Sequence, residues 1–333
     1  MDELNHIVSL HEASVGFRSR SGDIVLLENL NLQVKSGELT GLIGRNGAGK
    51  STLLRCIVRL HRLLHGSVTL KNRNIQDIHP NEFAQVLAYV SSGLEYSETM
   101  TILEMVSLGR YPYTNWIGKL LPEDNRLIDD ALVQVGINHL AKRKLSEVSD
   151  GERQKAMIAR TLAQNTDLIV LDEPTAFLDL PSKYDIISLL HELTRKGKTV
   201  IYSTHDLNIA LRFSDKIWLI DNKNVHDGSP EDLILDKTIA GIFESDKILL
   251  NQTTGDFEIR KHLTRKLSLK CENPHLLHWT RQALQRAGYE IDNNRADLPL
   301  VTAEQIDNRI IWKIQRLNET LVFESIYDML SSL

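Results

Sequence analysis

Residues 44–52 read Gly-Arg-Asn-Gly-Ala-Gly-Lys-Ser-Thr and directly follow a short, mostly apolar stretch, residues 39–43. This run fits the pattern G-x-x-x-x-G-K-[ST]. After it, apolar residues recur with helical spacing from Leu53 to Leu60. A strand, a glycine-rich turn and a helix in this order are the context in which the pattern predicts a phosphate-binding loop. The segment therefore predicts an α/β fold that binds a nucleotide.

The chemistry of phosphate binding explains these residue types. Glycines let successive backbone N–H groups curl around phosphate oxygens, and the helix N-terminus adds its positive end. We expect Lys50 to reach the β- and γ-phosphates and Ser51 to ligate Mg²⁺. The alternative is a glycine turn with an incidental lysine, which the flanking strand and helix disfavour. The predicted nucleotide-binding residues of the loop are Gly44, Asn46, Gly47, Ala48, Gly49, Lys50, Ser51 and Thr52.

A second apolar stretch, residues 168–171, delivers two acidic residues, Asp172 and Glu173. A buried parallel strand would bring this pair to the carboxyl edge of the sheet, where ligands bind in such folds. There Asp172 is expected to hold Mg²⁺ through water, and Glu173 to polarise the attacking water as general base. The alternative is that the two acids only cap the following helix.

The remaining N-terminal sequence predicts three kinds of structure. Residues 7–36 show short apolar runs around turn residues, which is typical of antiparallel strands. Residues 199–203 predict another buried strand of the parallel sheet. Between the loop and the acidic pair, residues 95–165 have mostly helical periodicity, with prolines as breaks. The expected fold is thus a mixed sheet core with an antiparallel β subdomain and a helical subdomain.

Three further motifs resemble those of ATP-binding cassette (ABC) proteins. Ser149-Asp150-Gly151-Glu152-Arg153-Gln154 resembles the family's L-S-G-G-Q signature, and it lies just before the acidic strand. Residues 176–179, Ala-Phe-Leu-Asp, are similar to the D-loop, and residues 203–206, Ser-Thr-His-Asp, are similar to the switch-histidine motif. Taken alone, the signature segment could be a helix N-cap. The resemblance covers about residues 6–245 and rests on five ordered motifs.

This resemblance implies an ATPase that uses ATP and Mg²⁺ and works as a head-to-tail dimer with a second copy of itself. Nucleotide held by Lys50 and Ser51 of one copy would meet the signature of the other. The resemblance places Phe17 on adenine, although Phe17 could equally be a partly buried strand residue. It implies the catalytic residues Glu173, His205, Lys50 and Asp179, and the further nucleotide-binding residues Phe17, Ser149, Gly151 and Glu152.

Two positions depart from the family pattern. Ser92 stands where the family carries a glutamine that senses Mg²⁺, and a serine would reach the metal only through water. Asp150 replaces the first glycine of the signature pair and adds a negative charge near phosphate. Because Ser149 and Gly151 are retained, we expect activity to be retained.

Residues 108–124 resemble the importer subfamily that serves iron chelates, haem and cobalamin. The stretch contains Leu-Gly-Arg-Tyr-Pro-Tyr at 108–113, then Trp116, Gly118 and Glu123-Asp124. The alternative is a helix end with ordinary breaker residues. The importer interpretation implies transmembrane permease subunits as partners, an indirect link to a substrate-binding protein, and a peripheral place at the cytoplasmic face of the inner membrane. Tyr111, Tyr113 and Trp116 are then candidate permease contacts.

Other functions remain as alternatives. They are a non-transport cassette acting on DNA or ribosomes, an ABC exporter subunit, and a small-molecule kinase. The chain has a net charge of −5 and no apolar run of about 18 residues, so bulk charge does not favour nucleic acid and no spanning helix is expected. A kinase would lack the signature and the switch histidine. The two cysteines, Cys56 and Cys271, support neither a disulfide framework nor a zinc site.

The length of 333 residues leaves room for a second, smaller domain. We expect the ABC domain at residues 1–245 and a small accessory α/β domain of unknown role at 246–333. In the latter, residues 255–260, 267–270 and 310–314 predict strands, whereas 274–287 and 324–333 predict helices. The transported cargo is not identified by the sequence.

Overall fold

A computed structural model of the protein describes residues 6–20, 22–91, 97, 99–114, 118–252, 254–259, 263–295, 297–306, 309–316 and 319–333. The chain divides into two compact units, Met1–Ile242 and Phe243–Leu333. Each unit has a hydrophobic core of its own, so each is described by itself.

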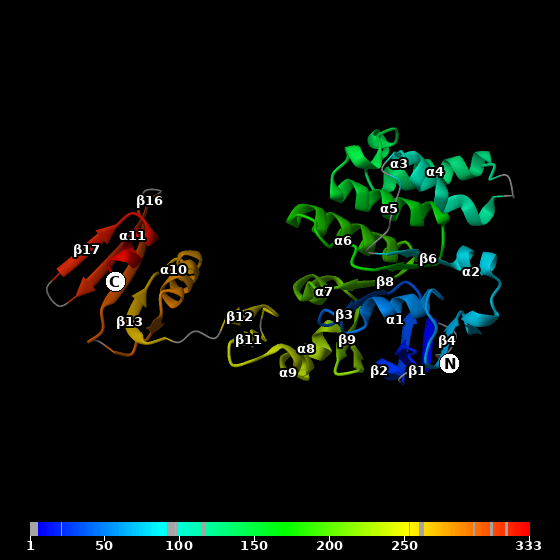
Figure 1. Cartoon of the computed structure of the whole chain (residues 1–333). Helices are drawn as coiled ribbons and strands as arrows, with labels where there is room; N and C mark the ends of the chain where they lie inside the picture. The colour runs from blue at the N-terminus through cyan, green and yellow to red at the C-terminus, as the bar shows by residue number, and fades with distance from the viewer. Residues whose placement is uncertain are drawn as a thin grey trace. The chain divides into compact units, whose positions relative to one another are not determined.

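The first unit is built on a sheet of six strands in the order β10-β9-β3-β8-β7-β6 (Figure 1). Neighbouring strands are parallel except for the hairpin of β9 and β10, so the expected mixed sheet is confirmed. The strands are β3 (Leu39–Ile43), β6 (Leu87–Val90), β7 (Leu168–Leu171), β8 (Thr199–Thr204), β9 (Lys216–Asp221) and β10 (Asn224–Gly228). Every residue of β3, β7 and β8 is buried, as their apolar sequences predict.

A second sheet of four strands has the order β2-β1-β4-β5 and is entirely antiparallel. Its strands are β1 (His6–Phe17), β2 (Ile24–Lys35), β4 (His65–Leu70) and β5 (Arg73–Asn74). The antiparallel prediction for residues 7–36 is confirmed. The other two strands come from residues 65–74, beyond the stretch in which the sequence predicted strands.

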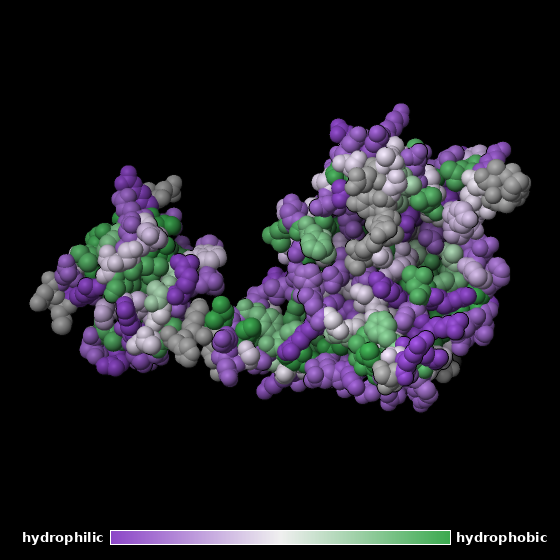
Figure 2. All heavy atoms as spheres, in the orientation of Figure 1, coloured by the Kyte–Doolittle hydropathy of each residue, from purple (hydrophilic) through white to green (hydrophobic). Residues whose placement is uncertain are grey.

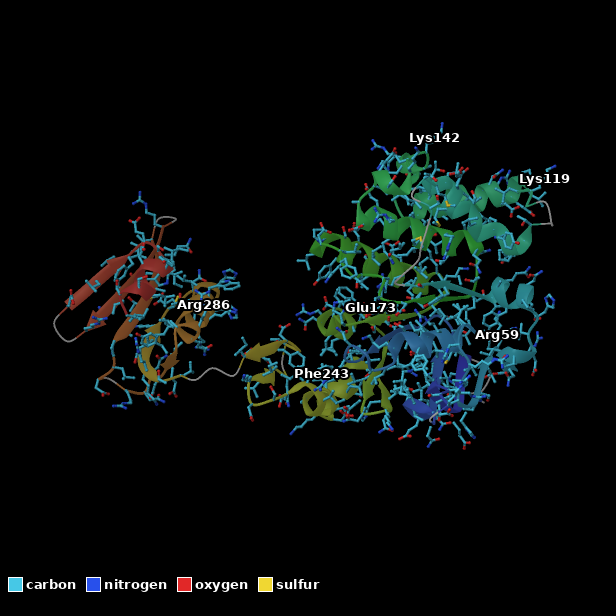
Figure 3. The ribbon with its side chains drawn as sticks, in the orientation of Figure 1. Arg59, Lys119, Lys142, Glu173, Phe243 and Arg286 are labelled. Carbon is cyan, nitrogen blue, oxygen red and sulfur yellow. The ribbon has the colours of Figure 1, made fainter. Side chains whose placement is uncertain are left out.

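Helices cover the sheet on both faces through two cores. One core joins the helical subdomain and α6 to the sheet, and the other joins α1 and the antiparallel sheet to its opposite face. The helices are α1 (Lys50–Ile57), α2 (Pro80–Val86), α3 (Ile102–Ser107), α4 (Pro122–Gln134), α5 (Asp150–Gln164), α6 (Leu180–Arg195), α7 (Leu207–Phe213), α8 (Pro230–Leu235) and α9 (Thr238–Phe243). Lys119 and Lys142 mark the outer end of the helical subdomain in Figure 3, and Glu173 lies toward the sheet.

The second unit contains a five-stranded sheet in the order β14-β13-β15-β16-β17 and a separate hairpin of β11 and β12. Its elements are β11 (Ile248–Leu250), β12 (Phe257–Ile259), β13 (Arg265–Lys270), α10 (Pro274–Arg286), β14 (Tyr289–Ile291), β15 (Leu300–Ile306), β16 (Arg309–Arg316), β17 (Glu319–Phe323) and α11 (Ile326–Ser331). The predicted strand at 310–314 and helix at 274–287 are present, whereas β11, β14, β15 and β17 were not predicted.

Among the described residues, no helix is long and apolar enough to cross a membrane. On the face shown in Figure 2, hydrophobic residues gather in patches between hydrophilic ones.

Candidate nucleotide-binding site

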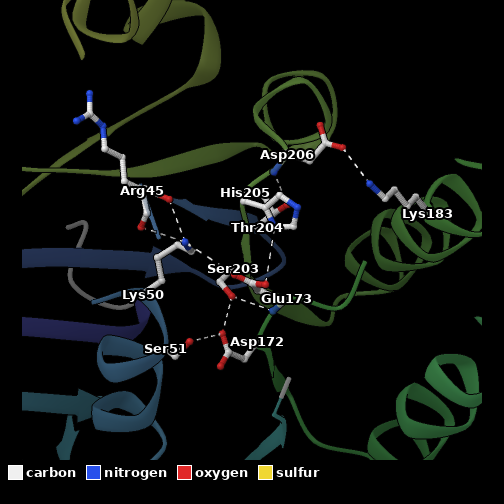
Figure 4. A network of polar contacts seen from close by, with 11 residues as sticks. Arg45, Lys50, Ser51, Asp172, Glu173, Lys183, Ser203, Thr204, His205 and Asp206 are labelled. Carbon is white, nitrogen blue, oxygen red and sulfur yellow. Dashed lines mark hydrogen bonds and ion pairs between the residues drawn. The ribbon is translucent and has the colours of Figure 1, made fainter. Parts of the chain in front are cut away.

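The loop between β3 and α1 wraps around the Lys50 ammonium group. Gly47 and Gly49 have φ of 80° and 104°, in the region where a side chain is strained, so the loop needs glycine at both positions. Lys50 Nζ donates hydrogen bonds to the carbonyl oxygens of Gly44, at 2.9 Å, and Arg45, at 3.4 Å (Figure 4). Burial lowers the pKa of Lys50, and the nearby carboxylates of Glu173 and Asp172 counteract that effect. The loop thus holds a buried cation beside backbone donors, as phosphate binding requires.

Ser51 and Asp172 meet at the base of the loop. Ser51 Oγ donates a 2.9 Å hydrogen bond to Asp172 Oδ1, and Asp172 is 1% exposed. Hydroxyl and carboxylate oxygens are the hard ligands that Mg²⁺ prefers, and one or two protein oxygens suffice when phosphates complete the shell. The donor set therefore fits Mg²⁺. Ser92, the third expected metal ligand, lies outside the described residues.

Glu173 lies between Lys50 and His205. Its Oε1 is 3.8 Å from Lys50 Nζ and its Oε2 is 3.7 Å from His205 Nδ1. The backbone of Glu173 has φ of 53°, an unfavourable conformation for a side-chain-bearing residue, of the kind found at functional sites. This conformation follows the end of β7 and turns the carboxylate toward the cation of the loop (Figure 4).

Ser203, on β8, connects the two acidic residues. Its Oγ donates to Asp172 Oδ1 at 2.7 Å and accepts from the backbone N–H of Glu173 at 2.9 Å. Ser203 belongs to the strand predicted at residues 199–203 and to the switch motif, but neither pattern predicted a role for its hydroxyl. A serine within a fully buried strand is the signal that could have identified it, because a buried hydroxyl needs hydrogen-bond partners.

Asp179 and Asp206 begin helices beside the site. Asp179 Oδ1 caps α6 by accepting from Ser182 N at 3.1 Å, and the hydrogen bonds from Ser182 lower the pKa of its carboxyl group. Asp206 caps α7 and forms an ion pair with Lys183 at 3.6 Å. The predicted catalytic residue Asp179 therefore has a structural role in the single chain, and its catalytic role stays a prediction.

The signature segment forms the N-terminus of α5. Ser149 and Glu152 make a reciprocal capping box, in which Glu152 Oε2 accepts from the Ser149 N–H and hydroxyl, both at 2.9 Å. These hydrogen bonds lower the pKa of Glu152. A Cβ on Gly151 would lie 2.9 Å from Ser182 Oγ, so glycine permits the start of α5 to approach α6. Ser149 is thus an N-cap, as the alternative interpretation said; a capped helix start is also compatible with an anion site.

Asp150 has a charge partner on the next turn of α5. Its Oδ1 is 2.6 Å from Arg153 Nη1, and Arg153 also donates to the carbonyl oxygens of Leu145 and Val148. The added negative charge of the signature is therefore compensated within the segment. Asp150 stands three residues before Arg153 on a helix, and this spacing could have predicted the ion pair from the sequence.

Phe17 ends β1 and packs against His61. The ring centroids are 5.3 Å apart, and His61 Nε2 lies 2.8 Å from the Gly16 carbonyl oxygen, which fixes the histidine ring. Phe17 is 45% exposed, so one side of its ring remains open to a base.

The importer-like stretch 108–113 folds as a short 3-10 helix in which Gly109 and Arg110 are buried. Arg110 forms a 2.8 Å ion pair with Asp124, donates to the Ala163 carbonyl oxygen and stacks on Tyr113. Gly109 lets this turn pack closely against α5, because any side chain at this position would clash with the carbonyl oxygen of Arg160. Tyr113 also donates to the Gln164 carbonyl oxygen, whereas Tyr111 is 75% exposed; Trp116 lies outside the described residues.

Comparison with known proteins gives the family. Residues 27–176 match the family described as ABC transporter, and residues 264–333 match the Iron ABC transporter C-terminal domain. The chain is 38% identical over 224 residues to the petrobactin import ATP-binding protein FpuD of Bacillus anthracis, covering 67% of this chain and 82% of that protein. The chain belongs to the ABC transporter ATP-binding proteins. The family prediction is thus confirmed, and the protein is an ATPase that binds ATP.

Other ABC proteins agree with this assignment. The ferric enterobactin transport ATP-binding protein FepC of Escherichia coli is 38% identical over 224 residues, covering 67% of this chain and 83% of that protein. A structure described as a metal-chelate type ABC transporter superposes with a TM-score of 0.62 at 28% identity, covering 72% and 89% of the two chains. The dimeric cassette MJ0796 with ADP and Pi superposes with a TM-score of 0.60 at 29% identity, covering 67% and 98%. The cassette fold of this ABC ATP-binding protein is therefore confirmed.

Proposed function

We propose that this ABC ATP-binding protein supplies the energy for import of an iron chelate, with a siderophore as the cargo class. The observation that carries the proposal is the match of residues 264–333 to the Iron ABC transporter C-terminal domain. The printed names of two relatives, for petrobactin import and ferric enterobactin transport, support the same cargo class. Haem and cobalamin are the alternative cargoes of the importer resemblance.

The geometry suggests how the chain's residues divide the reaction. Lys50 and the loop N–H groups would bind the β- and γ-phosphates, and Ser51 with Asp172 would hold Mg²⁺, which neutralises phosphate charge when bound. Glu173 would accept a proton from the attacking water, because its carboxylate lies between the phosphate-loop cation and His205. His205 Nδ1 near Glu173 is placed to orient that carboxylate or to contact the γ-phosphate. Phe17 would stack on the base.

The functional unit is proposed to be a head-to-tail dimer of this chain. Phe177, four residues after Glu173, is 94% exposed and has φ of 62°, and Leu180 is 67% exposed. Two exposed apolar side chains on either side of Asp179 are expected to be covered by a partner. The solved dimeric structure of the cassette MJ0796 with ADP and Pi supports a dimer. Ser149 and Gly151 would then meet nucleotide bound to the second copy.

Permease subunits are the proposed membrane partners, which places the protein peripherally at the cytoplasmic face of the membrane. Tyr111 is the candidate anchor, because it is 75% exposed, whereas Arg110 beside it is buried and Tyr113 is held by Arg110 and by the Gln164 carbonyl oxygen. Aromatic side chains of this kind are enriched at buried interface anchors. A substrate-binding protein would act only through the permease.

Co-purification with a polytopic membrane protein tests this function. The full chain, tagged at one end, is purified from detergent-solubilised membranes, and Tyr111→Ala serves as the interface variant, with Tyr327→Ala as an exposed tyrosine control from the second unit. Recovery of a permease that the Tyr111 variant loses supports the proposal. ATP-dependent retention on DNA or ribosomes instead would overturn it in favour of a non-transport ATPase.

A further inference from the structure

The second unit contains a cavity of about 690 Å³ at the carboxyl end of β13, along the neighbouring parallel strand β15. β13 pairs with β15 only over residues 268–270 and 300–302, after which the chain leaves β13 for α10 while β15 continues. The cavity lies at this divergence. Its lining includes Lys270, Cys271, Glu272, Leu300, Thr302 and Glu304.

The two strands that follow β13 in the chain lie on opposite sides of it in the sheet, so the order in which strands are added reverses at β13. From β13 the chain passes through α10, whose Leu276 and Leu284 pack on one face, to β14 on one side of β13. The next strand, β15, lies on the other side of β13. Ser268 Oγ, on the face opposite the core, donates to the carbonyl oxygens of Asp292 and Arg295, so these two residues lie over that opposite face. In open α/β sheets, such a reversal at strand carboxyl ends is where ligands bind.

Donor groups without a partner line the cavity. Thr302 lies between Lys270 and Lys313 in the register of three adjacent strands. Thr302 Oγ1 is buried and has no hydrogen-bond partner within the part of the chain that the structure describes. Lys313 is neutralised by Glu304 at 2.7 Å, whereas no ion pair of Lys270 is found among those residues. The unsatisfied Thr302 hydroxyl lies beside the exposed cation of Lys270 on the neighbouring strand, and an anionic acceptor could satisfy both donors.

The surroundings restrict the anion to a single charge with a carbon skeleton. The N-terminus of α10 contributes no free donor at its cap, because Asn273 Oδ1 already accepts from His275 N and Leu276 N. Glu272 at the rim disfavours a second negative charge on the ligand. Leu300 supplies apolar wall, and the volume is in the range of small-molecule sites.

We infer that this cavity is a binding site for a small organic monocarboxylate, with Lys270 and Thr302 as its recognition residues. The site belongs to the second unit alone and does not rest on the proposed transport function.

Cys271 lines the cavity and is a native reporter of it, so no thiol has to be introduced. Full-length protein is treated separately with iodoacetate and with iodoacetamide, and alkylation of Cys271 is timed by peptide mass spectrometry. Cys56 is 1% exposed and burial raises its pKa to about 12, so it serves as the silent internal thiol. We expect Lys270→Met to lower the ratio of iodoacetate to iodoacetamide rates by about threefold, and Thr302→Val to lower it less. Arg281→Gln, an equal loss of charge on the exposed side of α10, should leave the ratio unchanged.

Reversible binding is tested with benzoate against its neutral analogue benzamide. Benzoate should slow alkylation of Cys271 by iodoacetamide in the wild-type protein, and this protection should be lost in Lys270→Met and reduced in Thr302→Val. The inference is overturned if benzoate and benzamide have the same effect, or if Lys270→Met and Arg281→Gln change the rate ratio equally. Both readouts are independent of ATP hydrolysis, so they do not depend on the fate of the importer proposal.

Discussion

Ser203 Oγ donates a 2.7 Å hydrogen bond to Asp172 Oδ1 from the neighbouring strand of the sheet. The same oxygen accepts from the Glu173 N–H at 2.9 Å, so one buried hydroxyl fixes both acidic residues of the site. Ser203 on β8 thus positions the carboxylate proposed for Mg²⁺ and the backbone of the proposed general base, which both follow β7.

Ser203→Ala is expected to lower kcat for ATP about tenfold, because Asp172 and the Glu173 N–H each lose a hydrogen-bond partner in a buried environment. ATP affinity should change little, since Lys50 and the loop are untouched. Steady-state ATPase assays and nucleotide titration measure the two effects. Ser214→Ala removes another buried serine hydroxyl, one that is bonded to Tyr202, and is the matched control. Equal loss of kcat in both variants would remove Ser203 from the positioning role.

Glu173→Gln should bind ATP and hydrolyse it at least about a hundredfold more slowly, because the amide keeps the shape of the side chain but cannot accept the proton. The variant should accumulate as a closed dimer with ATP, which size-exclusion chromatography with light scattering detects. Near-normal turnover would remove Glu173 from the general-base role, and a monomer that binds ATP would count against the dimer.

Lys50→Ala should weaken ATP binding by about tenfold or more, because the variant loses both the phosphate cation and the hydrogen bonds to the Gly44 and Arg45 carbonyl oxygens. Equilibrium titration with a fluorescent ATP analogue measures the change. Lys183→Ala, which removes a surface lysine paired with Asp206, is the control and should retain affinity. Unchanged affinity in the Lys50 variant would contradict the phosphate-loop assignment.

Much of this site could be predicted from sequence because its residues are contiguous. Gly44 to Thr52 form one loop, and Asp172 with Glu173 follow one strand, so local pattern fixed their place at the edge of the sheet. The partners that join separate segments could not be predicted in this way. Ser203 reaches Asp172 only after β8 pairs with β7, and Arg110 reaches Asp124 only after the helical subdomain packs.

The same physical limit applies to the second unit. The helix at 274–287 has an N-cap asparagine, Pro274 and a terminal glycine, so its start and end could be predicted from local sequence alone. β14 and β15 are short or half-polar, and Thr302 belongs to a strand whose opposite face alone is buried. Their pairing depends on contacts distant in sequence, which a periodicity search does not detect.

Arg153→Gln tests whether the charge of Asp150 is tolerated because it is compensated. With Arg153 gone, an uncompensated carboxylate would face the phosphates bound to the second copy, and ATPase activity should fall about threefold, more at low salt. Asp150→Gly should retain activity, and the double variant should recover it. If the double variant is as impaired as Arg153→Gln, the Leu145 and Val148 carbonyl contacts of Arg153 matter and its charge does not.

Breaking the buried Arg110–Asp124 pair at one partner is expected to destabilise the helical subdomain. Arg110 is 5% exposed and Asp124 is 2% exposed, so removing one partner leaves the other charge buried, which costs about 3–5 kcal/mol. Asp124→Asn should therefore lower the Tm of the cassette in scanning calorimetry. Arg110→Met with Asp124→Leu removes both charges and should recover most of the loss. A single variant as stable as the wild type would show that the pair contributes little.

The same pair predicts an acid dependence of stability. Burial raises the pKa of Asp124, but hydrogen bonds from Leu121 N and Arg110 and the charge of Arg110 outweigh it, so the pKa lies below the ordinary value of 3.8. A carboxyl group whose pKa is lower in the folded state stabilises the protein above the pKa of the unfolded chain, and that contribution is lost as the pH falls through the folded value. The Tm of the wild type should therefore begin to approach that of Asp124→Asn below about pH 4, where the unfolded chain starts to bind the proton, and the difference should vanish once the folded carboxylate is protonated as well. A constant difference in Tm between the two proteins from pH 7 to pH 3 would show that the carboxylate charge of Asp124 is not what stabilises the helical subdomain.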